Sequence, residues 1–149
     1  TWLRLQPQRT GIFRGACAEY CGTSHGLMSF YVEVMEREAF DEWLAHQARP
    51  ATAPSGAQAV RGAELFLESG CSACHTVRGT PAAGVIGPDL THVGGRLSIG
   101  GGIMETTPAR LRDWLARTAH IKPGVHMPEF GMLPDADLQA LAAYLHGLK

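Results

Sequence analysis

The stretch Cys71-Ser72-Ala73-Cys74-His75 decides how the second half of this chain folds. A C-x-x-C-H string is the attachment signature of a c-type haem, in which two cysteines bond to the porphyrin and the histidine binds its iron. A bare C-x-x-C pair would also be compatible with half of a zinc site or with a thioredoxin-like redox pair. Those alternatives would need a second pair of zinc ligands or alternating strands and helices, and the surrounding sequence has neither. We therefore expect Cys71, Cys74 and His75 to hold a covalent haem.

Segments with helical spacing of apolar residues surround the haem string. Residues 57–69 precede it, and residues 108–119 and 135–148 follow it, with leucines and aromatic residues three and four positions apart. Residues 79–102 are rich in glycine and too long for an ordinary connection, so we expect them to wrap the haem. The sequence predicts a small all-α domain over residues 57–149.

The sixth ligand of the iron must come from a side chain that follows the haem string. Met127 is favoured because two prolines and a glycine fix the backbone of its loop, Lys122-Pro-Gly-Val-His-Met-Pro128. Its neighbour His126 is the main alternative, and a methionine ligand would give the higher potential. A methionine in such a domain often only fills the core. The remaining candidates are Met104, Met132, His92 and His120.

A second string of metal-binding residues lies nearer the N-terminus, Cys17-Ala-Glu-Tyr-Cys21-Gly-Thr-Ser-His25-Gly-Leu-Met28. Two thiolates, an imidazole and a thioether are soft ligands, suited to copper rather than to magnesium or calcium. A mononuclear blue copper site needs only one cysteine, so two cysteines indicate a bridged pair of copper ions. A local disulfide or a copper-delivering thiol pair is the alternative, although delivery proteins usually have proline where Gly22 stands.

Residues 1–47 are expected to form the unit that carries the copper string. Residues 11–17 and 30–35 have the β-branched and aromatic residues of short strands, and residues 36–47 have helical spacing. Residues 48–56 contain two prolines, a serine and a closing glycine, which is linker composition. The sequence therefore predicts a copper unit, a linker and a haem domain in this order.

The composition fits a globular protein with no nucleic-acid partner. The chain has 149 residues, of which 45% are hydrophobic and 18% charged, and a formal net charge of −1 without long runs of one sign. No stretch approaches the roughly 18 consecutive apolar residues of a membrane span. Because c-type haem is attached outside the cytoplasm, we expect an exported or membrane-face location, with the export signal upstream of this chain.

Three stretches resemble a known family. They are Gly15-Ala-Cys-Ala-Glu-Tyr-Cys-Gly22 with His25 and Met28, Gly87-Pro-Asp-Leu90, and Lys122-Pro-Gly-Val-His-Met-Pro128. Residues 11–35 resemble the copper loop of cytochrome c oxidase subunit II, which holds the dinuclear CuA site. Residues 57–149 resemble the cytochrome c domain fused to that subunit in caa3-type oxidases. The resemblance implies a mixed chain, in which the C-terminal portion of a cupredoxin β-sandwich over residues 1–47 precedes an all-α class I cytochrome c domain.

The resemblance also assigns the copper ligands. Cys17 and Cys21 would bridge the two copper ions, and His25 and Met28 would each bind one of them. The backbone carbonyl of Glu19 would be a weak further ligand. Its side chain would reach toward a magnesium ion at the border with subunit I.

In the haem domain, the resemblance implies that the Pro88 carbonyl accepts a hydrogen bond from the proximal His75 and fixes the orientation of its ring. The implied function is that of the subunit through which electrons enter a haem-copper terminal oxidase. Electrons would pass from a cytochrome c-type donor through haem c and CuA to subunit I, which reduces oxygen. The alternatives are a nitrous oxide reductase with fused CuA and cytochrome parts, and a free cytochrome c shuttle. No residue here is expected to perform acid–base or nucleophilic chemistry.

One feature departs from the family pattern. The family's other copper-binding histidine lies on a strand well before the first cysteine, and this chain begins too close to Cys17 to include it. The two membrane helices and most cupredoxin strands are absent too, and residues 1–47 alone are too few to bury a stable β core. We therefore expect part of a longer subunit, associated with other oxidase subunits at the outer or periplasmic face of a bacterial inner membrane. Its CuA site would be incomplete unless another histidine, such as His46, serves.

Overall fold

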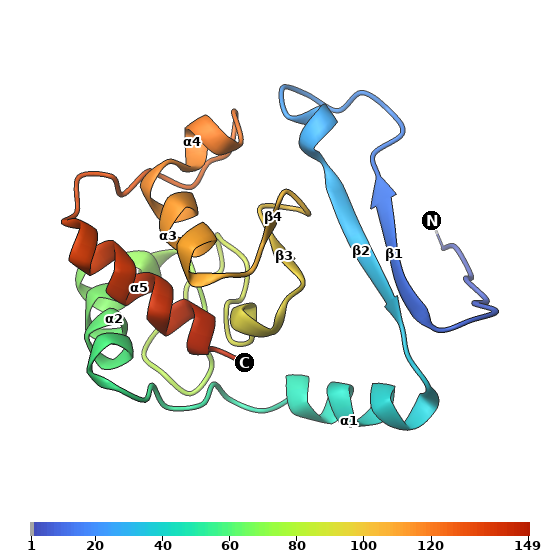
Figure 1. Ribbon diagram of the computed structural model, residues 1–149, viewed down its shortest axis with the longest axis horizontal. Coiled ribbons are helices and arrows are strands. Elements are labelled where there is room, and N and C mark those ends of the chain that lie inside the picture. Colours follow the sequence, from blue (N-terminus) through green and yellow to red (C-terminus); the bar gives the residue numbers. More distant parts are fainter. Residues whose placement is uncertain (1) are drawn as a thin grey trace.

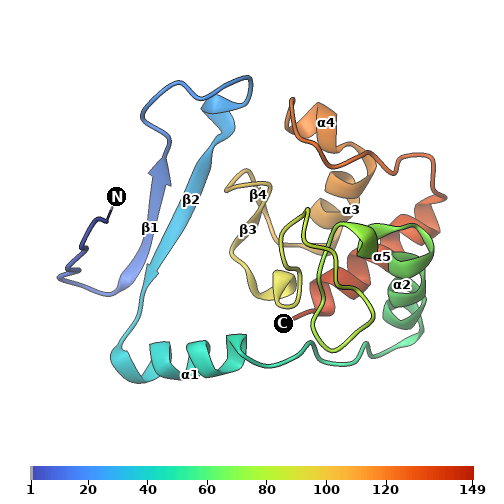
Figure 2. The same ribbon diagram turned by 180° about the vertical axis from the view of Figure 1, so that it is seen from behind.

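The computed structural model describes residues 2–149, in which a β-hairpin stands beside a helical domain (Figures 1 and 2). The expected strands and the helix that follows them are confirmed. Their bounds are β1 (Gly11–Ala16), the short 3-10 helix η1 (His25–Leu27), β2 (Ser29–Val34) and α1 (Arg37–Gln47). The strands pair antiparallel, with Gly11 opposite Val34 and Ala16 opposite Ser29. This register brings the two ends of the copper string together at the top of the hairpin.

A cupredoxin β-sandwich is not evident in residues 2–149, where only two sheets of two strands each occur. The expected sandwich portion is therefore reduced to the hairpin β1–β2. A lone hairpin cannot cover both of its faces and is at best marginally stable. Accordingly, Ile12 is 55% exposed and Phe30 is 56% exposed. Further exposed apolar side chains of this unit are Phe13, Tyr31, Phe40, Trp43 and Leu44.

The helical domain begins after the expected linker. Its elements are α2 (Ala57–Glu68), η2 (Cys71–Ala73), η3 (Val93–Gly95), β3 (Ser98–Ile99), β4 (Met104–Glu105), α3 (Pro108–Ala116), α4 (Thr118–Ile121) and α5 (Asp135–Gly147). The single helix expected over residues 108–119 was wrong in its extent. Arg117 has φ −145° and ψ 43°, which is not helical, so the chain breaks between α3 and α4.

Helices α2 and α5 form the centre of this domain. A Cβ placed on Gly62 would lie 2.0 Å from the Ala140 carbonyl oxygen, so the two helices approach closely only because residue 62 has no side chain. Next to this contact, Phe66 and Tyr144 pack edge to face with ring centroids 5.6 Å apart. The core around them includes Leu65, Leu111, Leu115, Leu138, Leu141 and Leu145.

The segment over residues 48–56 is partly attached to the helical domain. The Ala51 N–H donates to the Arg78 carbonyl at 2.8 Å, and the Arg78 guanidinium donates to the Gln47 carbonyl at 2.6 Å. Residues 52–56 are exposed. Within the described residues, no helix combines the length and the apolar character needed to cross a membrane.

Candidate metal centres

A cavity of about 970 Å³ is lined by both the haem string and the loop of Met127. The structure therefore brings together Cys71, Cys74, His75 and Met127, which come from separate parts of the sequence. Much of the remaining wall is apolar, as ligand cavities usually are. Residues on this wall include Phe66, Ile99, Leu111, Leu115, Leu141 and Leu145.

His75 is held in one orientation. It is 8% exposed, and its Nδ1 lies 2.8 Å from the Pro88 carbonyl oxygen. Because a carbonyl only accepts, Nδ1 carries a proton, and Nε2 is the ring nitrogen that could bind a metal. A Cβ on Gly87 would lie 2.4 Å from the ring, so this loop packs directly against the imidazole. This cradle fits an iron-binding histidine.

The two cysteines of the haem string form no disulfide, and they have different environments. Cys71 is buried at the start of η2, and Cys74 is half-buried. Burial raises the pKa of the Cys71 thiol. The His75 N–H donates to the Cys71 carbonyl at 2.9 Å, and the Gly87 N–H donates to the Cys74 carbonyl at 2.7 Å. These bonds fix the backbone of both cysteines next to His75, so that all three side chains can serve one porphyrin.

The candidates for the sixth ligand differ in whether they line the cavity and in how far they are buried. Met127 and His126 both line the cavity, but Met127 is half-buried against the core whereas His126 is exposed. His92 also lines the cavity, and its Nε2 lies 3.1 Å from the Arg49 carbonyl oxygen. The other candidates lie outside the cavity wall; they are Met104, Met132 and His120. The structure therefore favours Met127 over His126.

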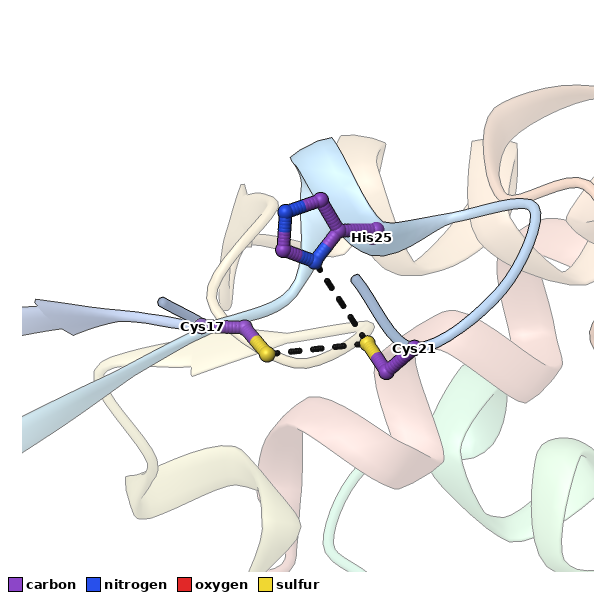
Figure 3. A group of neighbouring side chains, drawn as sticks. All are labelled: Cys17, Cys21 and His25. Carbon is purple, nitrogen blue, oxygen red and sulfur yellow. Dashed lines mark hydrogen bonds between the residues drawn. The ribbon is translucent and has the colours of Figure 1, made fainter. Parts of the chain in front are cut away.

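The copper string forms a compact cluster in the loop between β1 and β2. Figure 3 shows Cys17, Cys21 and His25 pointing toward one another, and their possible ligand atoms all lie within 4.8 Å. The Cys21 Sγ lies 3.5 Å from the Cys17 Sγ, 3.6 Å from the His25 Nδ1 and 3.5 Å from the Met28 Sδ. The Cys17 N–H donates to the Met28 carbonyl at 3.0 Å, which closes the loop. All four expected ligand side chains therefore converge within this loop.

Glu19 contributes to this cluster through its backbone. Its carbonyl accepts a hydrogen bond from the Cys17 Sγ at 3.1 Å, whereas its carboxylate is exposed and accepts from the Tyr20 N–H at 3.2 Å. The hydrogen bond between the Cys21 thiol and the Cys17 Sγ, with smaller contributions from burial and from the Cys17 charge, raises the pKa of Cys21. His46, which is in α1, packs against His92 and is not part of the copper cluster.

Hydrogen bonds that the sequence did not reveal join the copper loop and the start of β2 to the helical domain. The Ser24 Oγ donates to the Pro123 carbonyl at 2.5 Å, which joins the copper loop to the loop that carries Met127. The Ser29 N–H donates to the Gly101 carbonyl at 3.1 Å. Figure 1 shows the same approach, with the top of the hairpin beside α4 and the turn between β3 and β4.

Comparison with known proteins agrees with the haem cavity. The sequence model of the family described as cytochrome c matches residues 59–149, which is more than half of the chain. This chain belongs to the cytochrome c family. The predicted cytochrome c domain is thereby confirmed, and membership implies a covalently bound haem.

Relatives of this cytochrome c chain extend the similarity to the hairpin. Cytochrome c oxidase subunit 2 of Alkalihalophilus pseudofirmus is 36% identical over 145 residues, which is 97% of this chain and 42% of the relative. The subunit 2 of Bacillus subtilis is 34% identical, covering 93% of this chain and 40% of the relative. The subunit 2 of Bacillus sp. PS3 is 33% identical, covering 99% and 44%. The chain thus spans about two fifths of the length of these relatives.

Proposed function

We propose that this chain is the part of a haem-copper terminal oxidase through which electrons enter, taking them from a cytochrome c-type donor and passing them to subunit I for reduction of oxygen to water. The observation that carries this proposal is the convergence of Cys17, Cys21 and His25 in a loop whose Ser24 is bonded to the Met127 loop of a cytochrome c domain. Similarity to oxidase subunit 2 over nearly the whole chain supports it.

In the proposed haem site, Cys71 and Cys74 would form the thioether bonds and His75 would be the proximal ligand. Met127 would be the sixth ligand, because it is a half-buried methionine of the cytochrome c domain on the cavity wall. The bound haem supplies a one-electron redox centre. The protein orients it through the hydrogen bond from His75 to Pro88 and keeps water from the iron with the apolar wall.

In the proposed copper site, Cys17 and Cys21 would bridge the two ions of a CuA centre, and His25 and Met28 would bind one each. The Glu19 carbonyl is a weak ligand. Its exposed carboxylate is free to reach a magnesium ion at the border with subunit I. The bound copper pair supplies the second one-electron centre.

The proposed organisation is a cupredoxin part over residues 1–47, a linker over residues 48–56 and a cytochrome c domain over residues 57–149. The uncovered hairpin faces support the assignment of residues 1–47 to a larger β-sandwich, since Ile12 and Phe30 would be buried by further strands. The proposed location is the outer or periplasmic face of a bacterial inner membrane, in complex with subunit I and the other oxidase subunits.

The test is electron delivery in the purified oxidase complex that contains this chain. Cys21→Ser should abolish oxygen consumption driven by reduced cytochrome c, while the haem of this chain is still reduced by the donor and stays reduced. Thr23→Ser, in the same loop and outside the ligand set, should behave as the unaltered complex. Oxygen consumption that is unchanged by Cys21→Ser would refute the proposed function.

A further inference from the structure

His92 carries a buried nitrogen that the proposed roles of the chain do not use. The residue is 6% exposed and lines the haem cavity. Its Nε2 lies 3.1 Å from the Arg49 carbonyl, which only accepts, so Nε2 carries a proton and donates. Its Nδ1 is buried and has no hydrogen-bond partner among residues 2–149. Buried polar atoms nearly always have a partner, so this nitrogen calls for one from outside the chain.

The ring of His92 is fixed from two sides. The His46 imidazole of α1 packs against it with ring centroids 4.9 Å apart and an interplanar angle of 51°. The Arg49 carbonyl holds the opposite nitrogen, and the segment that bears Arg49 is itself bonded to Arg78 through Ala51. The ring therefore has little freedom to turn and satisfy Nδ1 with solvent.

Some polar and cationic residues line the cavity together with His92, and others lie next to it in the chain or in space. Gln47 and Arg96 line the cavity with it, and the Arg96 guanidinium donates to the Asp89 carbonyl at 2.5 Å. The neighbouring Thr91 Oγ1 accepts from the Arg78 side chain at 3.3 Å. The other ionisable groups around His92 are His46, Arg49 and Asp89, and His126 lines the cavity as well. The one carboxylate among these groups, Asp89, is paired with Arg78 at 3.6 Å, and the remaining groups are imidazoles or cations. This composition suits an anion, whereas the wall formed by the leucines suits the porphyrin face.

A haem presents two anionic carboxylates on the porphyrin edge away from its two thioether bonds. Given the haem site of the proposed function, we propose that His92 binds one of these carboxylates through Nδ1. This contact needs one proton between the two groups, in addition to the proton on Nε2. The proton comes from solvent when haem is bound. His92 is thus a positioning residue, and its proton adds a positive charge that favours the reduced haem.

The test uses the haem-loaded chain and measures its reduction potential against pH. The potential of the unaltered protein should fall as pH rises and the shared proton is lost. In His92→Gln the amide can still donate a hydrogen bond but does not titrate, so the potential should not change with pH. His120→Gln, which alters an exposed histidine outside the cavity wall, should keep the unaltered profile. A pH dependence that persists in His92→Gln would assign it to His46 or His126 and overturn the proposal.

A second measurement does not depend on a variant. In the reduced protein with nitrogen-15 in its histidines, NMR should show protons on both ring nitrogens of His92 at neutral pH. An unprotonated Nδ1 would overturn the proposal while leaving the haem site intact. Failure of the unaltered chain to retain a covalent haem would instead overturn the proposed function together with this inference.

Discussion

Gly87→Ala should displace His75 from its cradle. The added Cβ would lie 2.4 Å from the Cε1 and 2.7 Å from the Nδ1 of the imidazole, well inside contact distance. The Gly87 backbone has no positive φ, so alanine is strained only by this contact. The ring must move, and the 2.8 Å hydrogen bond from Nδ1 to the Pro88 carbonyl is the contact most directly affected.

Two effects of Gly87→Ala should lower the free energy of unfolding. Overpacking a well-filled site costs about 1–3 kcal/mol, and losing a partly buried hydrogen bond costs about 1 kcal/mol. The free energy of unfolding of the haem-loaded protein should therefore fall by roughly 2–4 kcal/mol. Gly147→Ala is the matched control, because nothing lies within 4 Å of its added Cβ, its φ is not positive and it lies outside the cavity wall, so it should not lower stability.

Denaturant unfolding followed by haem absorbance measures both variants. The haem spectrum before denaturation reports separately on the geometry of the proximal ligand. If Gly87→Ala and Gly147→Ala have the same stability and the same spectrum, the packing of this loop against His75 is not what orients the ring, and the reasoning is refuted.

Three further predictions follow from other parts of the molecule. Met127→Ala in the haem-loaded chain should open the sixth coordination position and lower the reduction potential; an unchanged spectrum would favour His126 instead. Mild proteolysis should cut within residues 52–56, which are exposed, and release a haem-bearing fragment that still melts cooperatively; cleavage mainly within residues 79–102 would show that the boundary is wrong. Gly62→Ala should destabilise the protein by about 1–3 kcal/mol despite the better helix propensity of alanine, because its Cβ meets the α5 backbone.

Local sequence patterns predicted the helices and strands well, because each pattern and each element lie within the same dozen residues. The haem string and the spacing of Cys17, Cys21 and His25 also predicted which side chains would converge, since a short loop keeps its own ligands close together. The break at Arg117 was missed because apolar spacing continues across it, and only the backbone angles reveal it.

Contacts between distant residues left no such pattern. Ser24 and Pro123 meet across 99 positions, and a serine in a loop predicts nothing about its partner. The hydrogen bonds of Ala51 and Gln47 with Arg78 likewise hold part of the segment whose composition predicted a linker. The composition of that segment gave no sign of these bonds. The role proposed for His92 depends on the burial of its Nδ1 and on the absence of a hydrogen-bond partner for this atom within residues 2–149. Neither property can be predicted from a sequence alone.

The central claim is that one chain carries a haem centre and a copper centre. The most direct test is to titrate the haem-loaded chain with copper, pass it through gel filtration and measure the copper that it retains. The double variant Cys17→Ser, Cys21→Ser is measured for comparison. The unaltered chain should retain copper and the double variant should lose it, with the haem spectrum the same in both. Because only one histidine joins the cysteines within residues 2–149, retention should fall short of a full copper pair and the purple mixed-valence spectrum should be absent. A complete purple centre would show that another histidine serves, and equal copper retention by both proteins would contradict the account.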